Sequence, residues 1–141
     1  MATNEEVDFN LLQKTAGPYP LEAFEFVREG LGYTVDQLQD MSNQMPDISG
    51  LDEDEDHHVS GQELCLGLRD FAIRQYGLLA PAVLQHWNVR RTADFGRIVF
   101  AMIDHGLMRK NERDSIDDFQ DVFDFEEEFA RDRVLEMLSN N

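Results

Sequence analysis

The sequence HVSGQELCLGLRDFAIRQYG, from His58 to Gly77, constrains the fold most, because it predicts a helix that is apolar on two sides. Ser60 and Glu63 have capping-box spacing, in which each side chain accepts from the backbone N–H of the other residue. One apolar face comprises Leu64, Cys65, Leu68, Phe71, Ala72 and Tyr76, and a second comprises Leu66 and Ile73. A helix with two apolar faces needs neighbours on both, so we predict that it lies at the centre of a helical fold.

Similar signals predict three helices before this one, over residues 4–16, 20–30 and 34–41. Asn4 is expected to cap the first helix, and Gly30 and Gly32 are expected to end the second. Thr34 then begins a short third helix, with Gln37 at the capping-box spacing.

Two helices are predicted after the central one. The first runs from Ala80 to Trp87, with Trp87 as a core anchor, and the second from Ala93 to His105. Thr92 is expected to cap the second helix, whose apolar stripe leaves Asp94, Arg97, Asp104 and His105 on the solvent side.

The C-terminal segment 107–126 is consistent with two structures. FQDVFDF alternates aromatic and acidic residues at period 2, which is typical of a β-hairpin, whereas Ser115 and Asp118 have the spacing of a helix cap. We favour the hairpin, followed by a last helix that Asp124 caps. The predicted fold class is therefore mainly α, with about six helices and one short hairpin near the C-terminus.

Size and charge limit the partners. The 141 residues, of which 42% are apolar, predict a single globular domain over 1–141. A net charge of −17 repels phosphate backbones and anionic lipid headgroups, so we expect neither nucleic acid nor membrane as the partner. The lone Cys65, the absence of a signal-peptide pattern and the lack of a long apolar run predict a cytoplasmic protein with no membrane span.

One alternative interpretation is that residues 61–126 form a winged-helix-like arrangement, because a winged-helix unit consists of three helices followed by a hairpin in this order. A basic patch of Arg90, Arg91, Arg97, Arg109 and Lys110 would surround the third helix. The patch could bind nucleic acid or a protein partner. The ten acids between residues 114 and 136 would lie beside the wing, which favours a protein partner.

A second alternative is metal binding by the acidic stretch 52–63, of which residues 52–58 lie in an expected mobile loop over 42–58. Asp52, Asp54, Asp56 and Glu63 occupy positions 1, 3, 5 and 12 of a calcium-loop template, and His57 and His58 could join a transition-metal site. The template needs glycine at position 6, where His57 stands, and a helix before the loop, which MPDISG does not supply. We therefore assign no metal and no cofactor.

Four segments resemble a small bacterial family of functionally unassigned proteins, best known from planctomycetes and verrucomicrobia. They are YPLEAFEFVREGLGYT, HVSGQELCLGLRDFAIRQYG, HWNVRRTADFGRIVFAMIDHGLM and DSIDDFQDVFDFEEEF. The resemblance covers roughly residues 19–129 and implies no activity, substrate or ligand.

No nucleophile elbow, glycine-rich phosphate loop or metalloprotease pattern occurs in the chain. Neighbouring residues such as His86 and Trp87, or Asp104 and His105, point in different directions on a helix and form no preformed dyad. The sequence therefore predicts a non-enzymatic, acidic protein-interaction domain.

Overall fold

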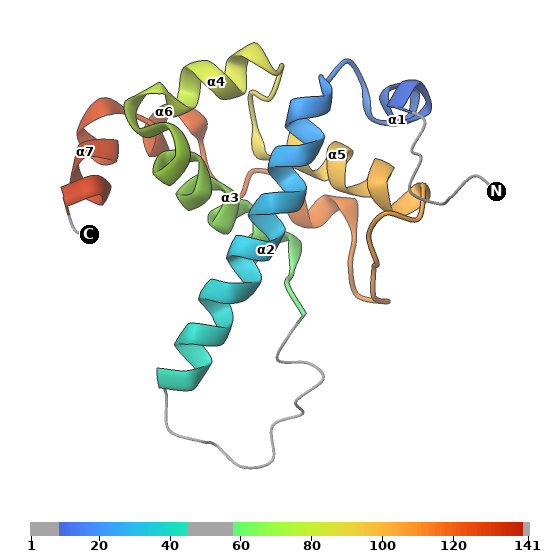
Figure 1. The fold of residues 1–141 in the computed structure, drawn as a ribbon, viewed down its shortest axis with the longest axis horizontal. Coiled ribbons are helices and arrows are strands. Elements are labelled where there is room, and N and C mark those ends of the chain that lie inside the picture. The colour runs from blue at the N-terminus through green and yellow to red at the C-terminus, as the bar shows by residue number, and fades with distance from the viewer. Residues whose placement is uncertain (1–8, 45–57, 140–141) are drawn as a thin grey trace.

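The computed structural model describes residues 9–44 and 58–139, and every regular element in these ranges is helical (Figure 1). The α-helices are α1 (Phe9–Ala16), α2 (Leu21–Gln44), α3 (Gly61–Tyr76), α4 (Ala80–His86), α5 (Thr92–Asp104), α6 (Phe125–Glu128) and α7 (Arg131–Ser139). The 3-10 helices are η2 (Gly77–Leu79) and η3 (Ile116–Phe119). The predicted mainly helical class is confirmed. Across these ranges, no helix has both the length and the apolar character of a membrane span.

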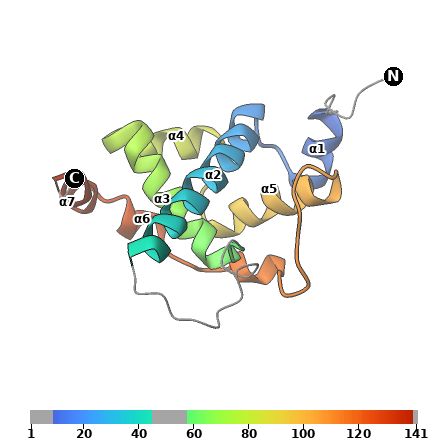
Figure 2. The same ribbon diagram turned by 60° about the horizontal axis from the view of Figure 1, so that its bottom comes forward.

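Helix α3 lies at the centre of the fold, as its two-sided apolar pattern predicts. Figure 2 shows α2 crossing α3, with α5 on one side and α6 and α7 on the other. The capping box at its start is present, since Glu63 N donates to Ser60 Oγ over 3.1 Å and Ser60 N donates to Glu63 Oε1 over 3.0 Å. The second apolar face is only partly buried, because Ile73 is buried whereas Leu66 is 40% exposed.

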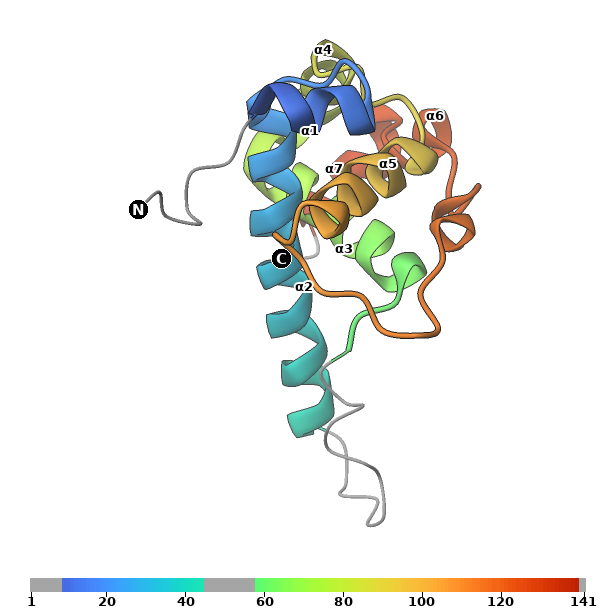
Figure 3. The same cartoon turned by 90° about the vertical axis from the view of Figure 1, so that its right-hand side faces the viewer.

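Helix α2 is one continuous helix of 24 residues, so the predicted break at Gly30 and Gly32 and the separate helix beginning at Thr34 are wrong. Thr34 is buried inside α2, and its hydroxyl donates to Gly30 O over 2.7 Å. A Cβ at Gly30 would overlap Leu68 of α3. The glycine therefore permits close helix packing instead of ending the helix, and α2 continues past the rest of the fold (Figure 3).

The segment 107–126 contains no strand, so the predicted hairpin is wrong. The competing cap at Ser115 forms instead and starts η3, with Ser115 N donating to Asp118 Oδ2 over 3.1 Å. Thr92 Oγ1 donates to Phe119 O over 2.6 Å and accepts from Val122 N over 3.1 Å. Because a side chain of α5 binds these backbone groups, they do not pair in a β-ladder. The winged-helix-like arrangement of 61–126 thus has its three helices but no wing.

The predicted last helix is divided into α6 and α7. Asp124 caps α6 as expected, accepting from Glu127 N over 3.1 Å. The break follows from tertiary contacts, because Glu128 accepts from Arg69 of α3 over 2.9 Å and the adjacent Phe129 is buried.

The start of α5 also differs from the prediction. Thr92 is the first helical residue and binds η3, while the carboxylate of Asp94 accepts from Arg90 N over 2.8 Å and from Arg91 N over 3.2 Å. Asp94, expected on the solvent side, is only 7% exposed. A buried carboxylate at the third helical position satisfies backbone donors at the positive end of the helix.

Candidate functional site

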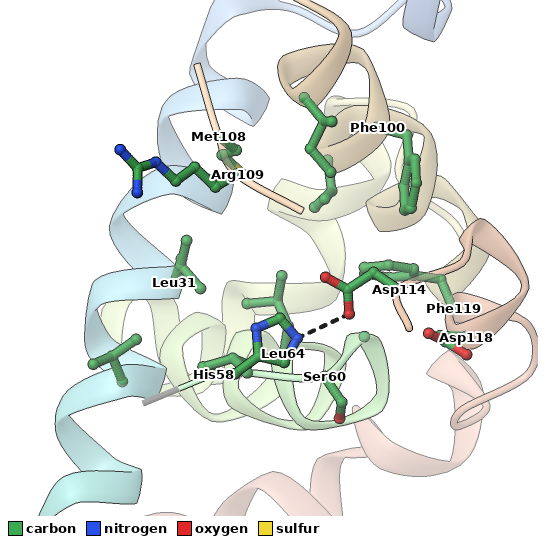
Figure 4. A pocket seen from close by; sticks show the side chains of 15 residues that line it. Leu31, His58, Ser60, Leu64, Phe100, Met108, Arg109, Asp114, Asp118 and Phe119 are labelled. Atoms are coloured by element: carbon green, nitrogen blue, oxygen red, sulfur yellow. Dashed lines mark hydrogen bonds and ion pairs between the residues drawn. The ribbon is translucent and has the colours of Figure 1, made fainter. Parts of the chain in front are cut away.

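A cavity of about 230 Å³ opens between α2, the start of α3, the end of α5 and the segment 107–119 (Figure 4). We call it the apolar cavity. Its apolar lining residues are Leu31, Val35, Val59, Leu64, Val99, Phe100, Ile103, Met108 and Phe119. Its polar lining residues are His58, Ser60, Arg109, Asp114 and Asp118. The lining thus combines a largely apolar interior with several charged side chains.

A hydrogen bond joins two segments at the edge of the apolar cavity. His58 Nε2 lies 2.9 Å from Asp114 Oδ1, which connects the residues before α3 to the segment after α5. The second oxygen of Asp114 accepts from Asn111 N over 3.0 Å, so the carboxylate is held from both sides. Arg109 contributes its stem to the lining, while Figure 4 shows its guanidinium pointing away from the other side chains.

A shallow polar hollow adjoins the apolar cavity and shares His58, Ser60, Asp114 and Asp118 with it. Glu63, Glu112 and Arg113 are its remaining charged residues. Counting Asp114 and Asp118, four acids face one arginine. A ligand that extends from the cavity into the hollow therefore meets a negative surface.

Helix α2 carries a second negative surface, which we call the acidic stripe. Five exposed acids recur at helical spacing on one side of α2: Glu22, Glu25, Glu29, Asp36 and Asp40. No ion pair within residues 9–44 and 58–139 involves any of them. The stripe is about 27 Å long at the rise of an α-helix, so the acidic charge extends along most of the length of α2.

A buried polar network fixes α5 against the segment before α2. The hydroxyl of Tyr19 donates to Asp94 Oδ1 over 2.6 Å. Burial, together with this hydrogen bond, raises the pKa of Tyr19 to about 12, although the nearby Arg97 guanidinium acts in the opposite direction. Contact with Tyr19 in turn raises the pKa of Arg97. The network ties Arg97 to the core of the protein.

We expect the free energy of unfolding to fall between pH 10 and pH 12. The phenol in the unfolded chain ionises near pH 10, whereas folded Tyr19 keeps its proton until about pH 12. The unfolded state therefore gains stability over this interval, by up to about 2.7 kcal/mol from Tyr19 alone.

Urea unfolding of the wild type and of Tyr19→Phe at a series of pH values measures this contribution. Tyr19→Phe should lose less stability on the alkaline side, and parallel curves would contradict the assignment. Burial also raises the pKa of Cys65 to about 12. Because Cys65 is present in both proteins, its effect cancels in the comparison.

The residues of the predicted basic patch lie before, within and after α5. Arg90 and Arg91 precede α5, whereas Arg109 and Lys110 follow it, and the 13-residue helix α5 between the two pairs is about 20 Å long. Arg97 lies in the middle of α5 near Tyr19. Lys110 donates to Asn111 O over 3.3 Å. Of the five, the structure places only Arg109 at the apolar cavity.

Among the predicted metal ligands, Asp52, Asp54, Asp56 and His57 lie outside the described residues, as does most of the predicted 42–58 loop. His58 is described and pairs with Asp114. Glu63, the last residue of the calcium template, forms the capping box with Ser60. Where the structure describes the chain, no three His, Cys, Asp or Glu side chains are grouped as metal ligands would be.

Cys65 is fully buried in α3, in agreement with its predicted place on the core face. Its raised pKa keeps the thiol protonated near neutral pH, and a thiol reacts as a nucleophile only through its thiolate. Trp87 is buried at 8% exposure beside Phe26 and Tyr76, as expected for a core anchor.

The sequence contains no local signal for the apolar cavity, because the residues that line it come from four separate segments. The acidic stripe is visible in the sequence, because its acids recur at intervals of three, four, seven and four residues, which is the spacing of one helix face. Because a helix end is predicted at Gly32, these acids fall on two predicted helices, and their common face is not recognised from the sequence.

No protein family matches the chain, and neither a curated protein nor a solved structure shows significant similarity to it. The resemblance to the planctomycete and verrucomicrobial family stays a prediction.

Proposed function

We propose that this chain is a non-enzymatic cytoplasmic protein-interaction domain that binds its partner through the apolar cavity. The observation that carries the proposal is the composition of the cavity, in which an apolar interior adjoins charged side chains. Protein interfaces have this arrangement, with apolar side chains at the centre and polar groups around them. A volume of about 230 Å³ is below the roughly 300–1,000 Å³ of sites for drug-sized molecules, which favours a side chain as the occupant.

Nucleic-acid binding by the arginines receives less support. Within α5 the exposed charged side chains are Arg97 and Asp104, so the helix has no basic face. The segment expected to form a wing is instead docked on α5 through Thr92. Arg90 and Arg91 alone are a small cationic surface on a chain of net charge −17.

A differential pull-down tests the proposal with immobilised wild type, Val35→Gln and Leu21→Gln. Val35 is a half-buried lining residue of the cavity, whereas Leu21 is 46% exposed at the other end of α2. Glutamine has a higher helix propensity than valine, so Val35→Gln should fold. We expect a partner that the wild type and Leu21→Gln retain and that Val35→Gln loses.

Equal retention of every captured protein by all three baits would contradict the use of the cavity. Reproducible turnover in an activity screen would contradict the non-enzymatic assignment. Far-ultraviolet circular dichroism of the three baits checks that each remains helical.

A further inference from the structure

We propose that the apolar cavity binds one aliphatic side chain of a partner peptide whose neighbouring residues are lysine or arginine, and that these cations lie in the polar hollow. This inference rests on the proposed function and names the chemistry of the partner.

The apolar cavity and the polar hollow adjoin each other and share lining residues. Asp114 and Asp118 line both the apolar cavity and the polar hollow. An extended peptide advances roughly 3.3 Å per residue, so residues that neighbour a side chain held in the cavity can reach the hollow. One short peptide segment can therefore place an apolar side chain in the cavity and charged side chains in the hollow.

The polar hollow is complementary in charge to a cationic partner. Glu63 and Asp118 each use one carboxylate oxygen for a local backbone N–H, Glu63 with Ser60 and Asp118 with Ser115. No hydrogen bond between described residues uses their second oxygens, and Glu112 is exposed beside them. These oxygens can accept from an ammonium or guanidinium group at the surface of the hollow. An acidic peptide would be repelled.

The walls of the apolar cavity favour an aliphatic side chain as the occupant. The cavity is lined by the rings of Phe100 and Phe119, which meet edge to face with centroids 6.2 Å apart. Phe119 is held firmly, because a Cβ at Gly61 or at Gly96 would lie within 3.0 Å of it. A rigid apolar wall formed by these rings favours a compact aliphatic side chain over a long charged one.

Fluorescence anisotropy with three labelled peptides tests the inference. The probe is Gly-Lys-Lys-Leu-Lys-Lys-Gly, the second peptide has alanine in place of leucine, and the third has glutamate in place of every lysine. We expect the leucine peptide to bind about tenfold or more tightly than the alanine peptide, since burial removes more apolar surface from water. The glutamate peptide should not bind, and affinity for the leucine peptide should fall with added salt.

Matched variants separate local recognition from general attraction. Val35→Gln should remove the difference between the leucine and alanine peptides, whereas Leu21→Gln should keep it. The pair Glu63→Gln with Glu112→Gln should weaken binding severalfold, and glutamine preserves the capping box at Glu63. The pair Glu22→Gln with Glu25→Gln on the acidic stripe changes the net charge equally and should have a smaller effect.

Three results would overturn the inference: equal affinity for the leucine and alanine peptides, equal effects of the two glutamate pairs, or a dimer in sedimentation that Val35→Gln dissociates. The last would identify a second copy of the chain as the occupant. If Val35→Gln still loses a pull-down partner while the peptides fail, the proposed function stands and this inference fails. If both experiments show no effect, both proposals fail.

Discussion

Asp94→Ala is expected to lower the free energy of unfolding by about 3 kcal/mol, because hydrogen bonds to a charged group each contribute about 1.5–3 kcal/mol. The carboxylate accepts from the Tyr19 hydroxyl, from Arg90 N and from Arg91 N. Alanine would leave the buried phenol without its partner and would remove the negative charge at the start of α5. The effect should appear as a lower urea midpoint with an unchanged slope.

Asp104→Ala is the matched control, since Asp104 is an exposed acid on the same helix and its removal should change stability by about 0.5 kcal/mol or less. A double-mutant cycle with Tyr19→Phe measures the Tyr19–Asp94 contact itself. Additive effects of the two substitutions would show that the hydrogen bond contributes nothing to stability.

Gly67→Ala is expected to destabilise the protein by a similar amount, about 3 kcal/mol, through overpacking. A Cβ at Gly67 would overlap the side chain of Thr34 across the α2–α3 contact. Thr34 cannot move away easily, because it is 3% exposed and its hydroxyl is bonded to Gly30 O. Thermal and urea unfolding measure the loss.

Gly32→Ala provides the opposite control. Gly32 is inside α2, as Gly67 is inside α3, but nothing lies within 4 Å of a Cβ built at Gly32. Alanine should stabilise α2 by about 0.5–1 kcal/mol through its higher helix propensity. Adding Thr34→Ala to Gly67→Ala should recover only part of the loss, because the Cβ of Thr34 itself lies 2.8 Å from the new methyl position. Full additivity of those two substitutions would contradict the overlap.

Local sequence signals predicted the helix boundaries well where the chain interacts mainly with itself. The capping box of Ser60 and Glu63 and the cap of α6 at Asp124 are both present. Each depends on hydrogen bonds or backbone freedom within a few residues, so nearby sequence contains the information.

The predictions failed where a residue from another segment changed the local preference. Thr92 was expected to cap its own helix, yet its hydroxyl binds the backbone of Phe119 and Val122. The alternating aromatic pattern that favoured a hairpin instead directs successive rings into the core, with Phe119 and Phe129 buried and Phe123 and Phe125 packed against it. The alternation of aromatic and acidic residues at period two therefore occurs here in a segment that forms no strand.

Sequence alone determined the helical class and the central place of α3, because hydrophobic periodicity and end caps are properties of short segments. Only the tertiary structure decided that α2 is continuous. Gly30, an expected helix end, packs closely against Leu68 of α3, and Thr34, an expected helix start, packs closely against Gly67 of α3. The apolar cavity likewise exists only after four segments have packed together. Its chemistry depends on distances between residues far apart in the chain, which no local pattern records.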